Sequence, residues 1–96
     1  MNDVQSLENL KLVMSVDACH RVVEGEAVVL DSQTGEYFNL NQSGTDILEA
    51  VVAGKSFNQI VVELASKYSI SESEIQKDVK ELLNELLENK VLLVSE

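Results

Sequence analysis

The 96-residue chain contains no tryptophan and no proline, and it has only two tyrosines and two phenylalanines. With so few aromatic residues, a hydrophobic core has to be built mainly from Val, Leu and Ile. No Pro-containing linker, low-complexity segment or internal repeat divides the chain, so we predict a single domain over residues 1–96. Residues 1–8 are polar with scattered apolar positions, and we expect them to be frayed.

Long hydrophobic runs are also absent. No apolar stretch approaches the roughly 18 residues that a membrane-spanning helix needs. Residues 1–8 contain neither a basic region nor an apolar signal segment. These features predict a cytoplasmic protein with no membrane partner.

Cys19 and His20 are the only cysteine and the only histidine. One cysteine excludes an internal disulfide, and two potential ligands are too few for a zinc site. Neighbours on a strand point to opposite faces, so we expect one of the two to face the core and the other to face solvent. Without a metal motif, a phosphate loop or a nucleophile elbow, the chain is not expected to be an enzyme or to bind a metal or cofactor.

Basic residues are scarce. Seven Lys and Arg against seventeen Asp and Glu give a net charge of −10. Nucleic-acid-binding proteins neutralise phosphates with Lys and Arg, so this balance argues against a nucleic-acid partner and against an anionic membrane. It favours a basic or neutral partner, drawn in by long-range attraction. The alternative is that the charge only keeps a small protein soluble.

The most informative segment runs from a strand to the start of a helix. Residues 28–30 are strand formers, and residues 31–35 form a turn in which Gly35 can adopt a positive φ. Residues 36–40 read as a second strand, and Asn41 can cap a helix that begins directly after it. A short strand held in this way can leave one edge free to pair with an extended peptide.

The secondary-structure pattern is weaker in the segment before this region and clearer in the segment after it. Residues 10–23 alternate apolar and polar positions with a break at Asp17-Ala18, which predicts one interrupted strand or two short ones, pairing with a strand at 27–31. From Asn41 the period is helical, and Gly54 suits the left-handed position that ends the first helix. The tail at 91–94 is either a strand or a tucked-in coil.

Two further helices have recognisable starts. Ser56–Gln59 and Ser71–Glu74 both have the form of a capping box. Strands followed by three helices predict an α+β, winged helix-turn-helix-like domain, with the helices on one face of a small antiparallel sheet.

An ordered set of residues along the chain resembles the pyrroloquinoline quinone biosynthesis protein D family. The residues that carry the resemblance are Asp31, Gly35, Tyr37, Leu40, Asn41, Gly44, Gly54-Lys55-Ser56, Ile60-Val61, Leu64, Tyr68-Ser69-Ile70-Ser71, Asp78-Val79, Leu82, Leu86 and Asn89-Lys90-Val91-Leu92. The match spans about residues 10–94, and it departs from the family at Asn89-Lys90, where many members have Gly.

The resemblance implies a three-stranded antiparallel sheet followed by three helices, and a non-catalytic recognition element for ribosomally made, modified peptides. The leader of a precursor peptide adds as a strand beside the third strand, against the third helix. The domain then brings the precursor to a leader protease or another modifying enzyme. A separate chain of this size is most similar to the leader-binding protein of lasso-peptide clusters.

Under this resemblance, peptide-binding residues are expected on the third strand and the third helix. Helical periodicity predicts that Ile75, Val79, Leu82 and Leu86 face the core, with the other apolar residues on one flank and an acidic row on the other. The predicted peptide-binding residues are Glu36, Tyr37, Phe38, Asn39 and Leu40 on the strand, and Gln76, Val79, Lys80, Leu83 and Leu87 on the helix.

Several questions stay open at this level. The alternative explanation of the helix stripe is a wide core face with a solvated charged face, which is the commoner case for any helix. The sequence does not decide which flank of the helix meets the strand. Tyr37 and Phe38 point to opposite faces, and one should pack inward. We expect that replacing Leu83 or Lys80 with Glu weakens leader binding without unfolding the domain. The competing functions are an acidic protein–protein scaffold and a DNA-binding winged helix, and the chain is expected to be a monomer or a weak or domain-exchanged dimer.

Overall fold

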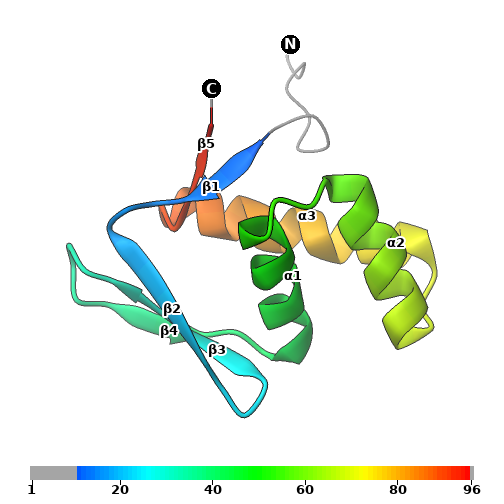
Figure 1. Cartoon of the computed structure of the whole chain (residues 1–96), viewed down its shortest axis with the longest axis horizontal. Helices are drawn as coiled ribbons and strands as arrows, with labels where there is room; N and C mark the ends of the chain where they lie inside the picture. The colour runs from blue at the N-terminus through cyan, green and yellow to red at the C-terminus, as the bar shows by residue number, and fades with distance from the viewer. Residues whose placement is uncertain (1–10, 96) are drawn as a thin grey trace.

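The computed structural model describes residues 11–95, so the prediction that residues 1–8 are frayed falls outside the described residues. Within residues 11–95, four strands are followed by three helices and a final strand (Figure 1). The elements are β1 (Leu12–Met14), β2 (Ala18–Val23), β3 (Glu26–Asp31), β4 (Tyr37–Asn39), α1 (Gln42–Val52), α2 (Phe57–Tyr68), α3 (Glu72–Glu88) and β5 (Leu92–Val94). The predicted α+β class and the winged helix-turn-helix-like order of elements are confirmed.

The strands form two separate sheets. The larger is a three-stranded antiparallel sheet in the order β2-β3-β4, and the smaller pairs β1 with β5. The prediction that both pieces of the 10–23 region pair with the strand at 27–31 is therefore wrong for β1. The chain turns between β1 and β2, and the Ser15 N–H donates to the Val91 carbonyl at 2.8 Å. The tail at 91–94 thus becomes a strand that closes the domain beside its first strand.

A tight hairpin fixes the register of the larger sheet. Glu24 and Gly25 have φ values of 53° and 83°, which is the two-residue turn whose twist matches that of the flanking strands. The turn aligns Val23 with Glu26, and the pairing continues to Ala18 opposite Asp31.

Polar side chains set the starts of the helices. Asn41 Oδ1 accepts from the Gly44 N–H at 2.8 Å, and Ser56 and Gln59 form the reciprocal capping box that the sequence predicts. The second predicted box is only half formed. Ser71 Oγ accepts from the Glu74 N–H, but the Glu74 carboxylate accepts from the Ser71 hydroxyl and not from its backbone N–H.

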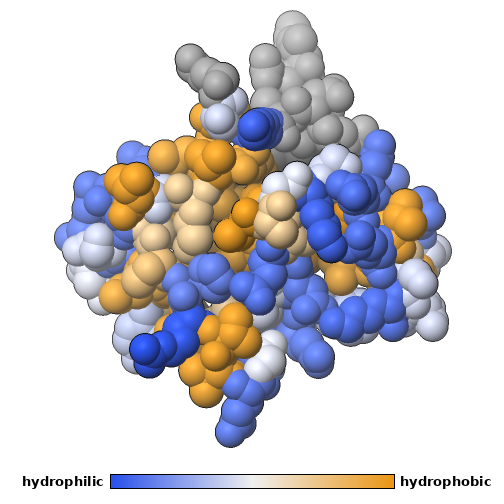
Figure 2. Space-filling model, viewed as in Figure 1, coloured by the Kyte–Doolittle hydropathy of each residue, from blue (hydrophilic) through white to orange (hydrophobic). Residues whose placement is uncertain are grey.

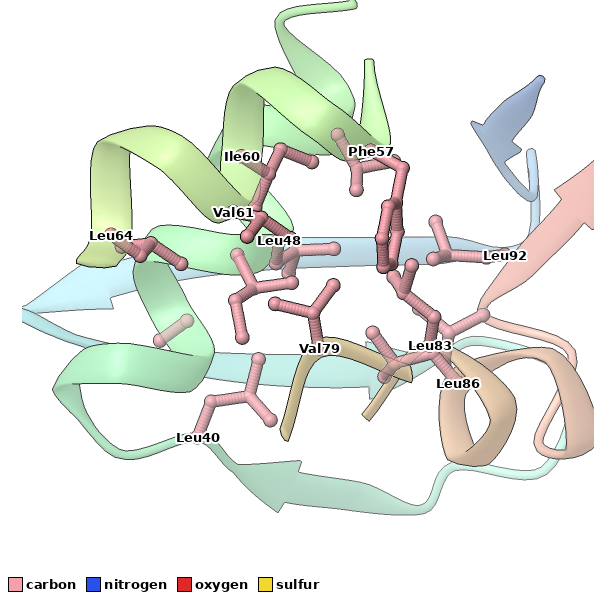
Figure 3. Packing of buried hydrophobic residues seen from close by; sticks show 14 of the residues in the cluster. Leu40, Leu48, Phe57, Ile60, Val61, Leu64, Val79, Leu83, Leu86 and Leu92 are labelled. Atoms are coloured by element: carbon pink, nitrogen blue, oxygen red, sulfur yellow. The ribbon is translucent and has the colours of Figure 1, made fainter. Parts of the chain in front are cut away.

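The core lies between the helices and one face of the β2-β3-β4 sheet (Figure 3). Ala27 and Val29 are fully buried on β3, and Leu48, Val61 and Leu86 meet them from α1, α2 and α3. Phe57 is the one buried aromatic among residues 11–95, which confirms an aliphatic core. A buried hydrogen bond of 2.7 Å from the Ala27 N–H to Thr45 Oγ1 ties α1 to β3.

A charged cluster joins α1 to the end of α2. The Asp46 carboxylate accepts from Lys67 Nζ at 2.8 Å and from Tyr68 Oη at 2.6 Å. Burial by itself would raise the pKa of Asp46, but these two hydrogen bonds outweigh it and hold the pKa below its usual value. The same contact raises the pKa of both Lys67 and Tyr68. The cluster therefore favours the charged form of the Asp46 carboxylate and links α1 to the end of α2.

On the molecular surface, Cys19 is exposed and His20 is half-buried, with Nε2 3.0 Å from Glu49 Oε2 on α1. This confirms that the two neighbours point to opposite faces of β2. Figure 2 shows one face of the molecule, on which hydrophobic residues gather over β1 and the start of β2. Across residues 11–95, every helix is too short or too polar to pass through a bilayer.

Candidate functional site

Strand β4 is an edge strand whose outer side is open. The Leu40 N–H donates to the Ala27 carbonyl at 2.8 Å, and the Asp31 N–H donates to the Glu36 carbonyl at 2.9 Å. Because hydrogen-bonded residues alternate in an antiparallel pair, residues 36, 38 and 40 direct their backbone groups to β3. Tyr37 and Asn39 direct theirs outward. Among residues 11–95 no strand pairs with this edge.

A groove of about 440 Å³ lies beside this edge, between the β4–α1 junction and the C-terminal half of α3. Its lining residues are Phe38, Asn39, Leu40, Asn41, Gly44, Leu82, Glu85 and Asn89. The floor is apolar, and Leu40 points into the core toward α3 (Figure 3). An open strand edge and a partly apolar groove therefore lie side by side.

The side chains of β4 divide between the two faces of the sheet. Phe38 is half-buried and packs against the core, whereas Tyr37 is 69% exposed. The prediction that they point to opposite faces, with one packed inward, is confirmed. Glu36 and Asn39 are exposed, and Leu40 is buried at the foot of the groove. All five predicted strand positions thus lie on or directly beside the open edge.

On α3 the predicted division of faces is wrong at Leu82 and Leu83. Leu83 is 2% exposed and belongs to the core with Val79, whereas Leu82 is half-buried and lines the groove. Successive residues of a helix are 100° apart around its axis. Because Leu83 rather than Leu82 faces the core, the side of α3 that faces the groove is the flank opposite to the one predicted. With Val79 and Leu83 enclosed in the core, Leu83→Glu is expected to unfold the domain, contrary to the sequence prediction.

The remaining predicted helix residues do not line the groove. Gln76, Lys80 and Leu87 are half-buried on the flank away from it. Lys80 Nζ lies 5.9 Å from the centre of the Phe57 ring, which places this flank beside the start of α2. In this orientation α3 packs against α2 and Leu83 lies in the core.

Three groove-lining residues of α3 and its C-terminus lie outside the peptide-binding set predicted from the sequence. Leu82, Glu85 and Asn89 follow one another at spacings of three and four, so they lie on one side of α3 and its C-terminus. That spacing is visible in the sequence and becomes informative once the rotation of the helix is known.

Gly44, at the start of α1, lines the side of the groove opposite α3, where there is little room for a side chain. A Cβ there would lie 3.2 Å from Asn41 Oδ1, 3.4 Å from Leu40 Cβ and 3.5 Å from Leu82 Cδ2. The absence of a side chain therefore lets the α1 start approach Leu82 while the cap hydrogen bond of Asn41 is preserved.

Taken together, these features define a winged helix-turn-helix-like domain with a strand edge open beside a groove on its third helix. Residues 26–92 match the family described as coenzyme PQQ synthesis protein D (PqqD), and the chain belongs to this family.

Two solved structures are similar to the chain. One is described as TbiB1 in complex with the TbiA(beta) leader peptide. It is 28% identical, with a TM-score of 0.78, and the match covers 82% of this chain and 92% of that one. The other is a lasso peptide synthetase B1 complexed with the leader peptide. It has a TM-score of 0.81 and coverages of 86% and 98%, and at 24% identity it supports the fold alone. No curated protein matches the chain.

Proposed function

We propose that this protein binds the leader segment of a ribosomally made precursor peptide, which adds as a further strand to the open edge of β4. The observation that carries the proposal is the open backbone of Tyr37 and Asn39 directly beside the groove on α3. Membership of the PqqD family and the 28% identity to TbiB1, described as a leader-peptide complex, support it.

The energetics assign different roles to the edge and the groove. Tyr37 and Asn39 offer two N–H donors and two carbonyl acceptors. Each main-chain hydrogen bond contributes about 0.5–1.5 kcal/mol net, whereas ordering a flexible peptide costs roughly 2–5 kcal/mol. These terms nearly cancel, so binding needs side-chain burial. One Leu-sized side chain seated on Phe38 and Leu82 adds about 1.5–3 kcal/mol.

We further propose that the protein is an adaptor and leaves catalysis to another protein. It would present the bound precursor to a separate leader protease or modifying enzyme of a lasso-peptide cluster. Without a leader, the open edge of β4 is available to a second copy of the chain, which is consistent with a monomer or a weak or domain-exchanged dimer.

The experiment is a fluorescence-anisotropy titration with the labelled leader half of a candidate precursor, chosen from short reading frames near this chain's gene. We expect saturable binding at micromolar affinity or tighter, and loss of binding when the peptide is scrambled. A labelled DNA duplex serves as the second control, and its affinity should be negligible. A folded protein that ignores the leader but binds the duplex would contradict the proposal.

A further inference from the structure

The groove beside β4 carries one charged side chain. Of its eight lining residues, Glu85 is the charged one, and the others are apolar residues, glycine and three asparagines. The lining residues from β4, from the start of α1 and from the residue after α3 are all uncharged. The electrostatic character of the groove is therefore set by a single carboxylate at its rim.

Glu85 occupies an electrostatically unfavourable position within its own helix. It lies in the last turn of α3, where the helix dipole is negative and where no basic residue is present. Glu88 lies in the same turn as Glu85, and Glu81 lies one turn before Glu85. Acidic side chains at this end of a helix are destabilising, and a cation placed there is favoured. An unfavourable charge at a helix end, placed beside a groove, is the pattern expected of a residue kept for function and not for stability.

A strand added to β4 would bring its side chains to this rim at a fixed spacing. Alternate residues of a strand face the same side, and residues i and i+2 are about 6.6–6.8 Å apart. If one side chain rests on the apolar floor formed by Phe38, Leu40 and Leu82, the next on that side reaches the groove's edge.

We propose, on the basis of the leader-binding function above, that Glu85 selects a leader with a Lys or Arg two positions from its apolar anchor. The anchor fills the floor of the groove, and the basic side chain pairs with the Glu85 carboxylate. This ion pair neutralises the negative end of α3. It also fixes the direction and register of the bound leader, which the main-chain hydrogen bonds of the β4 edge do not do because they accept any sequence.

The test uses the same labelled leader and three variants. Glu85→Gln keeps the shape and removes the charge, and it should weaken binding by about 3- to 10-fold, as expected for a partly desolvated ion pair. Glu85→Lys should weaken it further. Glu81→Gln is the matched control, because Glu81 is exposed, one turn away and outside the groove, and its affinity should stay within about twofold of wild type. The difference between Glu85→Gln and wild type should shrink at high salt.

A charge exchange identifies the partner. Each basic residue of the leader is replaced in turn by Glu, and the one that matters should lie two positions from an apolar residue and regain affinity with Glu85→Lys. Equal effects of Glu85→Gln and Glu81→Gln in a protein that binds the leader would overturn this inference and leave the leader-binding proposal standing. A folded wild-type protein that binds no leader would overturn both.

Discussion

Asn39→Pro is expected to lower leader affinity by at least about tenfold while the domain stays folded. The Asn39 N–H points away from β3, so proline removes no hydrogen bond of the native sheet. It does remove one of the two outward donors, and its ring occupies the space through which a further strand would approach. The measurement is the anisotropy titration, with circular dichroism and thermal unfolding to show that the fold is retained.

A matched control lies on the opposite edge of the same sheet. The pairing of β2 with β3 leaves the backbone of Val22 facing outward, and its side chain is 41% exposed. Val22→Pro therefore makes the same change at an edge far from the groove, and leader affinity should be unchanged. If the two proline variants lost affinity equally, or if neither did, addition of the leader to β4 would be wrong.

Leu83→Ala is expected to cost about 2–5 kcal/mol in the free energy of unfolding, because it empties a fully enclosed site in the core. A domain of this size has a total stability of roughly 5–15 kcal/mol, so the loss is a large share of it. The melting temperature should fall by more than about 10 °C. Chemical denaturation followed by circular dichroism measures the change.

The neighbouring Leu82 provides the contrasting variant. Leu82→Ala removes half-buried surface at the groove, so it should cost distinctly less stability and should weaken leader binding. Leu83→Ala should leave the affinity of the folded protein close to wild type. The reverse pattern, with Leu83 controlling affinity and Leu82 controlling stability, would show that the groove lies on the other flank of α3.

Much of the fold could be predicted because its signals are local. The Asn41 cap, the Ser56–Gln59 capping box and the left-handed Gly54 each depend on residues within one turn of the chain. The partner of β1 could not be predicted in this way. β1 pairs with β5, which lies at the other end of the described chain. The apolar pattern of a short strand is the same whichever strand it pairs with, so the sequence does not identify the partner.

In the candidate site, too, the locally determined features could be predicted and the features that depend on tertiary packing could not. The open strand followed at once by a helix is visible in residues 36–41, and the structure keeps that edge open. The groove-facing side of α3 is not visible, because its apolar stripe is wide enough to allow two rotations. In the folded domain α3 has the rotation that buries Leu83 and places Leu82 and Glu85 in the groove beside β4. The helix residues Gln76, Lys80 and Leu87, which the sequence predicts to bind the peptide, therefore lie on the flank away from this groove.

Residue-resolved amide hydrogen exchange by NMR, with and without the leader, shows directly whether the leader adds to the open edge of β4. Phe38 and Leu40 should already be protected in the free protein, because their N–H groups face β3. Binding of the leader should newly protect Tyr37 and Asn39, whose N–H groups face the open edge. Protection gained instead at the outer edge of β2, or a bound leader that leaves Tyr37 and Asn39 exchanging as before, would show that the leader does not add to β4.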